Sequence, residues 1–155
     1  MSMPQLSTET MSAFVKRTFN APREKVFRAW TEPEALKCWF GPEGFTLQSA
    51  EVDLRTGGSY RLAMKPANGD VYYHYGTYRE IDPPEKLVFT WILEDQPCDG
   101  SENQDCETLV TVEFRDLGAT TEVTLTHELL PTEQARAGHE FAWTASFDCL
   151  AAFVS

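Results

Sequence analysis

Long apolar runs and a basic leader are both missing from this chain. Nowhere do about eighteen apolar residues follow one another, so no segment predicts a transmembrane helix. The opening residues MSMPQLSTETMSAF also lack the basic stretch and apolar run of a secretory signal. We therefore expect a cytoplasmic protein without a membrane partner.

Basic residues are scarce. The chain has 13 Lys and Arg against 24 Asp and Glu, which gives a net charge of −11. A surface with this excess of negative charge repels phosphate backbones and anionic lipid. The composition therefore predicts that nucleic acid is not a partner.

Cysteine is also sparse, and its spacing excludes two classes of site. The four cysteines form no C-x-x-C pair, so neither a zinc ribbon nor a thioredoxin-like redox motif is supported. Cys98 and Cys106 bracket one polar loop and could form a disulfide. A reducing compartment favours free thiols instead.

The pattern of potential ligands predicts neither a metal nor a cofactor. The only three histidines, His74, His127 and His139, fall on different predicted elements, with no zinc-binding spacing. The stretch DQPCDGSENQDC has Pro97 and Cys106 where a calcium loop requires ligands. Its acidic residues are more simply a solvated loop. The stretch RTGGS lacks the spacing of a phosphate-binding loop.

What the chain does contain is enough apolar material for one folded domain. Its 155 residues are 42% hydrophobic and 12% aromatic, as expected of a globular protein. We expect a flexible polar tail over residues 1–10 and a single domain over residues 11–155.

Hydrophobic periodicity changes along the chain. A first strand is predicted over residues 12–20. A helix follows, with Asn20 or Ala21 near its cap and Pro22 in its first turn, and a second short helix covers residues 33–39. The period then becomes two, and turn residues such as Asn68-Gly69 separate the segments. Six more strands are predicted over residues 45–53, 59–65, 71–81, 86–93, 108–115 and 121–129.

The last segment, over about residues 132–152, has helical spacing and a wide apolar face that includes Trp143 and Leu150. A helix that lies in the trough of a strongly curved sheet would bury such a face. Glu140 and Asp148 fall outside the apolar stripe, and we expect them to face solvent. This pattern favours a helix that closes a pocket against the sheet over a helix that carries catalytic residues. The order of segments indicates an α+β helix-grip fold, in which an antiparallel sheet wraps around a long C-terminal helix.

Several blocks of the sequence are similar to one known family. The stretches FNAPREKVFRAWTEPEALKCWFGPEGF, DLRTGGSYRLAM, GTYREIDPPEKLVFTW, VTVEF and TEVTLTHELLP occur in the family's order. The chain resembles the activator of heat-shock-protein-ninety ATPase homologue (AHSA-type) family of the START-like, polyketide-cyclase-like superfamily. The resemblance extends from about Phe14 to Leu150. Phe40 stands where the family often has a second tryptophan, and Ala142 where it often has glycine.

The resemblance implies about seven antiparallel strands around the C-terminal helix, two short helices after the first strand, and a cavity between sheet and helix. Relatives use this cavity for lipids, hormones or polyketides, and some perform cyclisation or dehydration there. Shared fold does not transfer function. A chaperone partner is suggested by family analogy alone.

We expect the cavity wall to be formed by inward-facing residues chosen from strand alternation and family position. Among them His127 shares a face with Val123 and Leu125. A hydrogen-bonded structural histidine is the preferred interpretation, because no carboxylate partner can be identified for a general base. No catalytic residue is assigned. The expected wall residues are Trp39, Phe40, Met64, Tyr78, Trp91, His127, Trp143 and Phe147.

The leading hypothesis is a small bacterial protein that binds a hydrophobic or aromatic small molecule and has no cofactor. One alternative is a cyclase- or dehydratase-like enzyme that uses His127 with a tyrosine such as Tyr78. Another is a co-chaperone-like interaction module. The sequence leaves a homodimer open.

Overall fold

The computed structural model describes residues 11–40, 45–67, 69–93, 106–130 and 132–154. The predicted tail and residues 94–105 of the acidic loop lie outside the described residues. So does Cys98, and with it the possible pairing of Cys98 with Cys106. None of the described helices is long and apolar enough to cross a membrane.

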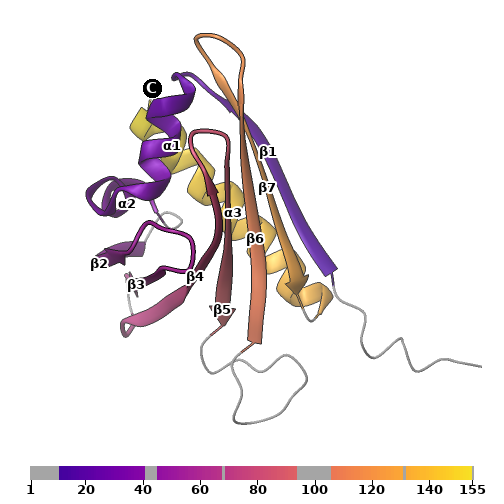
Figure 1. Ribbon diagram of the computed structural model, residues 1–155. Helices are drawn as coiled ribbons and strands as arrows, with labels where there is room; N and C mark the ends of the chain where they lie inside the picture. The colour runs from indigo at the N-terminus through magenta and orange to yellow at the C-terminus, as the bar shows by residue number, and fades with distance from the viewer. Residues whose placement is uncertain (1–10, 41–44, 68, 94–105, 131, 155) are drawn as a thin grey trace, which may run out of the picture.

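Seven strands and three helices make up the described chain (Figure 1). Two short helices separate the first strand from a run of six strands, and one long helix ends the chain. The elements are β1 (Met11–Phe19), α1 (Arg23–Thr31), α2 (Pro33–Trp39), β2 (Phe45–Val52), β3 (Ser59–Pro66), β4 (Tyr72–Asp82), β5 (Lys86–Leu93), β6 (Cys106–Asp116), β7 (Thr121–Leu130) and α3 (Glu133–Val154).

The strands form one antiparallel sheet in the order β1-β7-β6-β5-β4-β3-β2. Strands β2 to β7 are a simple meander, and β1 pairs with β7 to become an edge strand. Alternate residues of each strand point to one buried face, as in the run Val123, Leu125 and His127 of β7. The predicted seven-stranded sheet is therefore confirmed.

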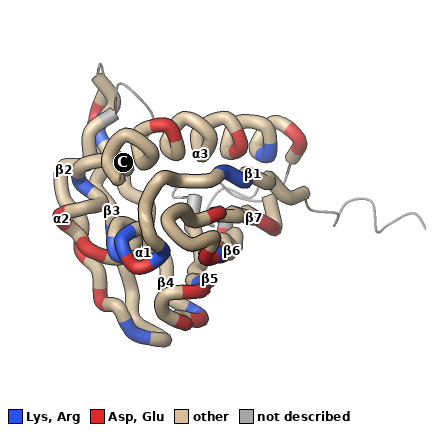
Figure 2. The backbone as a smooth tube through the Cα atoms, turned by 90° about the horizontal axis from the view of Figure 1, so that it is seen from above, with Lys and Arg blue, Asp and Glu red and all other residues tan. Residues whose placement is uncertain are grey.

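Helix α3 packs chiefly along β1 and makes fewer contacts with β7 (Figure 1). Its buried residues follow one stripe: Trp143, Ser146, Phe147, Leu150 and Val154. Three acidic residues and Arg136 lie along the same helix (Figure 2). The predicted helix-grip architecture, with a long C-terminal helix against the curved sheet, is confirmed.

The start of the first helix differs from the prediction. Pro22 is the N-cap, with extended backbone angles of φ −70° and ψ 156°, and α1 begins at Arg23. The carbonyl oxygen of Pro22 accepts hydrogen bonds from the backbone N–H groups of Lys25 and Val26. Pro22 therefore precedes the first turn. The second helix begins at Pro33 and ends at Trp39, as predicted.

The turn between β2 and β3 explains the Gly57-Gly58 pair. Gly57 has φ +86°, which favours glycine. A Cβ on Gly58 would lie 2.1 Å from the carbonyl oxygen of Asp53, so a side chain does not fit there. Asn68, in the predicted Asn-Gly turn, lies outside the described residues.

Candidate ligand-binding site

Aromatic rings occupy the space between the sheet and the helices. Trp30 of α1 contacts Trp39 of α2 with ring centroids 4.9 Å apart, and it stacks on Trp143 of α3 at 5.9 Å. Trp143 in turn contacts Trp91 of β5 at 5.2 Å. Phe40, directly after α2, lies 6.0 Å from Trp91. All three helices therefore meet the sheet through one aromatic layer.

A small apolar cavity of about 20 Å³ lies beside this layer. Its walls come from α1, α2 and strands β2 to β5, and the lining includes no residue of α3 among those described. A cavity of this size has room for about one water molecule. The lining residues are Trp30, Leu36, Phe40, Val52, Tyr60, Leu62, Tyr78, Phe89 and Trp91.

Two tyrosines supply the hydroxyl groups of this wall. The Tyr60 hydroxyl donates a hydrogen bond to the backbone carbonyl of Thr90 at 2.6 Å. Burial raises the pKa of Tyr60, and the neighbouring Tyr78 raises it further. Burial also raises the pKa of Tyr78. Both phenols are therefore neutral, and the cavity is uncharged.

The residues expected to line a cavity fall into two groups. Phe40, Tyr78 and Trp91 line the cavity under α1 and α2. The other five are buried in the surrounding core: Trp39, Met64, His127, Trp143 and Phe147. The two short helices, rather than α3, thus close this cavity.

His127 is fully buried, and both of its ring nitrogens have hydrogen-bond partners. Trp143 Nε1 donates to His127 Nδ1 at 3.0 Å, and His127 Nε2 lies 2.7 Å from Thr108 Oγ1. The Thr108 hydroxyl donates to the carbonyl oxygen of Trp91 at 2.5 Å. Since that hydroxyl has one proton, it must accept from His127. The proton of the neutral ring is therefore on Nε2.

This arrangement makes His127 a structural residue. Burial lowers the pKa of His127, and the charges that His139 and His74 would carry lower it further. Protonation at Nδ1 would also break the bond from Trp143, because an N–H cannot accept a hydrogen bond. A general base needs a free lone pair near the substrate. The preferred interpretation from sequence, a hydrogen-bonded histidine, matches this geometry.

The His139 ring lies close to His127, and the His74 ring is connected to His127 through Trp91, although the three histidines come from different elements. The His139 ring of α3 is 4.9 Å from the His127 ring. The His74 ring of β4 stacks on Trp91 at 4.3 Å, and Trp91 contacts His127 at 6.0 Å. Burial lowers the pKa of His74 to about 4, and the charge that His139 would carry contributes to this lowering. The described residues contain no group of three potential metal ligands with suitable geometry.

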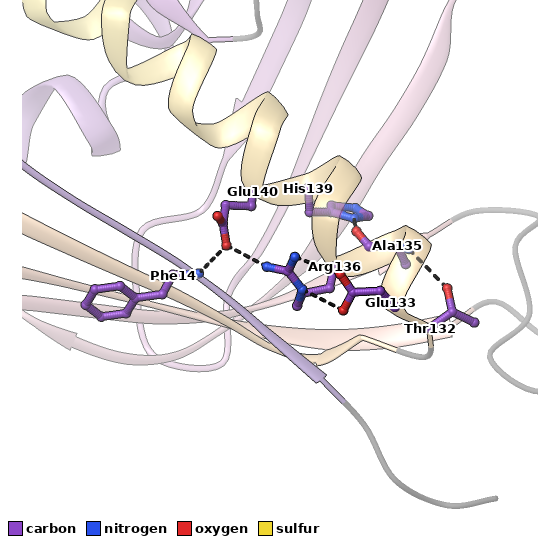
Figure 3. Close-up of polar contacts among 7 residues, drawn as sticks. All are labelled: Phe14, Thr132, Glu133, Ala135, Arg136, His139 and Glu140. Carbon is purple, nitrogen blue, oxygen red and sulfur yellow. Dashed lines mark hydrogen bonds and ion pairs between the residues drawn. The ribbon is translucent and has the colours of Figure 1, made fainter.

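His139 and Glu140 leave α3 in different directions (Figure 3). His139 Nδ1 lies 2.8 Å from the carbonyl oxygen of Ala135, and burial lowers the pKa of the ring. Glu140 accepts hydrogen bonds from Arg136 at 2.7 Å and from the backbone N–H of Phe14 at 3.5 Å. Its side chain is 41% exposed and lies outside the buried stripe, as expected, and it also makes these contacts. Glu140 thereby connects α3 to the edge strand.

The pair needed for an acid–base enzyme is not assembled. Tyr78 packs against Tyr60 at 5.6 Å and against Phe89 at 6.1 Å, within the cavity wall. His127 lies between Thr108 and Trp143, outside that wall. The two side chains considered for a cyclase or dehydratase are therefore in different parts of the interior.

Sequence reasoning missed three residues that shape the interior. Trp30 lines the cavity, but its position on a short amphipathic helix is equally typical of plain core. Thr108 shares the inward face of β6 with Val110 and Val112, and alternation alone could have placed it there. No pattern in the sequence marks His74 as part of this interior, because only the pairing of β4 with β5 brings it to Trp91.

Comparisons with known proteins agree with this architecture. The sequence profile of the Activator of Hsp90 ATPase homolog 1-like proteins matches residues 20–155. The crystal structure of a Chromobacterium violaceum protein is similar, with 27% identity, a TM-score of 0.82 and 98% of each chain covered. An AHSA1 protein of Silicibacter pomeroyi has 26% identity and a TM-score of 0.78, with 92% of this chain and 96% of that one covered.

A more distant relative shares the fold. An AHSA1-like protein of Aeromonas hydrophila is 21% identical, with a TM-score of 0.76 and coverage of 93% of this chain and 92% of that one. A comparison with curated protein sequences gives no match. Because the family profile covers most of the chain and the fold agrees, this protein belongs to the family of Activator of Hsp90 ATPase homolog 1-like proteins.

Proposed function

We propose that the protein binds a hydrophobic or aromatic small molecule in the interior between the sheet and the two short helices. The observation that carries the proposal is the cavity under α1 and α2, whose lining is apolar and aromatic with two tyrosines. Small-molecule sites usually combine such apolar walls with a few polar groups that set orientation.

The described conformation is the closed form of this site. A cavity of about 20 Å³ is far smaller than the roughly 300–1,000 Å³ of typical ligand pockets. The ligand must therefore bind to an open conformation and shift the population toward it. The mobile wall in this proposal is α1 with α2, because these short helices carry Trp30, Leu36 and Phe40 into the lining.

The geometry gives less support to the enzyme hypothesis. Both nitrogens of His127 are engaged in hydrogen bonds, and Tyr78 is not near it. The co-chaperone hypothesis rests on the family description.

A titration with the neutral fluorescent probe N-phenyl-1-naphthylamine tests the proposal. We expect saturable binding of one probe per chain. Leu62→Phe enlarges a lining side chain and should weaken binding about tenfold by filling the cavity. Phe141→Ser is the control, because Phe141 is 76% exposed and lies outside the cavity.

Two results would count against the proposal. Binding that does not saturate would show only surface adsorption. Binding that Phe141→Ser abolishes and Leu62→Phe leaves unchanged would place the site on the outer face of α3. Native mass spectrometry of freshly purified protein, which detects a retained small molecule, offers an independent check.

A further inference from the structure

The four tryptophans of this chain differ in how their indole N–H groups are satisfied. Trp39 Nε1 donates to the carbonyl oxygen of Ala29 at 2.8 Å, and Trp143 Nε1 donates to His127. The Nε1 atoms of Trp30 and Trp91 are buried and have no hydrogen-bond partner. All four side chains are at least nine-tenths buried.

This difference coincides with the cavity. Trp30 and Trp91 both line it, one from α1 and one from β5. Neither Trp39 nor Trp143 is part of the lining. The two indole groups without partners are therefore the two that belong to the candidate site.

A buried donor without a partner destabilises a folded protein, which is why such groups are rare and call for an explanation. Apolar contacts alone would be served as well by phenylalanine. Tryptophan adds one N–H donor to a large apolar ring. Two unsatisfied donors in residues of the lining fit a ligand that supplies an acceptor when the site opens.

We propose that the ligand is a neutral aromatic compound with a carbonyl-type acceptor, such as an aryl ketone or quinone, and that the N–H groups of Trp30 and Trp91 recognise it. This inference rests on the proposed function and specifies its ligand class. The two N–H donors favour a ligand with a hydrogen-bond acceptor. The rings that stack on Trp30 or meet it edge-on favour a ligand with a flat aromatic body.

The charge of the site selects a carbonyl over a carboxylate. None of the described residues that line the cavity is charged, and the whole chain carries a net charge of −11. A buried carboxylate without a cationic partner is strongly disfavoured. A ketone oxygen accepts the same hydrogen bonds without a charge to desolvate.

Three probes of nearly equal shape test the inference by competition with N-phenyl-1-naphthylamine. The first, 2-acetonaphthone, carries a ketone. The second, 2-isopropylnaphthalene, has no acceptor, and the third, 2-naphthoate, carries a carboxylate. We expect the ketone to bind about fivefold tighter than the hydrocarbon, as one or two hydrogen bonds allow. The carboxylate should bind weakest.

The matched variants are four Trp→Phe substitutions, each of which keeps an aromatic ring and removes the N–H. Trp30→Phe and Trp91→Phe should reduce the preference for the ketone to about twofold or less. Trp39→Phe and Trp143→Phe should retain it. Without ligand, the first pair should lower the urea midpoint less than the second pair, which removes satisfied donors.

The outcomes separate this inference from the proposed function. If none of the three probes binds, the proposed function fails. If all bind but the ketone has no preference, or the preference survives in Trp30→Phe and Trp91→Phe, the inference is overturned and the proposed function stands. Carboxylate binding as tight as ketone binding would overturn the choice of a neutral ligand. Equal loss of stability in all four variants would show that the two donors are already satisfied.

Discussion

At the scale of single residues, the interior is organised by one chain of hydrogen bonds. It runs from Trp143 to His127, then to Thr108, and ends on the carbonyl oxygen of Trp91. Because each donor has one acceptor, the chain fixes the tautomer of His127 and connects α3 with β5, β6 and β7. Such a buried chain of hydrogen bonds stabilises the fold only while every donor and acceptor in it has its partner.

Thr108→Val should therefore lower the free energy of unfolding by about 1–3 kcal/mol, although the side chains have similar shapes. The substitution leaves the Nε2–H of His127 without a partner. Urea denaturation measures the effect. Thr124→Val, on the opposite face of β7, is the control and should change stability by less than about 0.5 kcal/mol. Equal small effects in both variants would contradict the hydrogen-bond chain.

At the scale of elements, α3 is attached to the edge strand β1 by polar contacts. Glu140 accepts hydrogen bonds from Arg136 and from the backbone N–H of Phe14 (Figure 3). Arg17 of β1 also pairs with Asp148. An edge strand exposes backbone groups that can pair with another chain, so native proteins cover or charge such edges. Here the Glu140 carboxylate of α3 accepts a hydrogen bond from one of these groups, the backbone N–H of Phe14.

Glu140→Ala should destabilise the protein by about 0.5–1 kcal/mol, the upper part of the range for partly exposed pairs. Asp148→Ala should cost less than about 0.5 kcal/mol, because Asp148 is mostly exposed. Amide hydrogen exchange gives a second measurement, in which the Phe14 amide should exchange faster in Glu140→Ala only. Unchanged exchange at Phe14 in that variant would show that the carboxylate does not protect the edge.

At the scale of the whole molecule, the neutral histidines make stability depend on pH. Burial lowers the pKa of His74, His127 and His139 in the folded protein, whereas an unfolded histidine titrates near about 6.5. Below that pH the unfolded chain binds protons that the folded chain excludes. The free energy of unfolding therefore falls as the pH decreases from about 6.5, and it is insensitive to these groups at higher pH.

For His127 alone the expected loss is about 1 kcal/mol between pH 6.5 and pH 5.5. Urea midpoints measured at pH 7.5, 6.5 and 5.5 give the slope. His127→Gln should be less stable throughout but should have a shallower slope, because one of the titrating groups is gone. A slope that the substitution leaves unchanged would mean that His127 is not the residue that excludes the proton.

The sequence alone determined the elements and the family. Period-two alternation located every strand of the sheet to within a few residues, and helical spacing located α2 and α3. These signals are local, because a strand or an amphipathic helix repeats its pattern over neighbouring residues. The quoted sequence blocks indicated the family, and the match over residues 20–155 confirms it.

Tertiary structure alone decided which residues share a site. His74, His127 and His139 are scattered in the sequence. Sheet pairing brings His74 and His127 to Trp91, and the position of α3 brings His139 to His127. The division of the tryptophans into two satisfied and two unsatisfied donors is likewise invisible in the sequence. Hydrogen-bond partners such as Ala29 and His127 are chosen by packing between elements. A one-dimensional pattern records which face a side chain takes, but the atoms that meet it across the interior depend on how the elements pack.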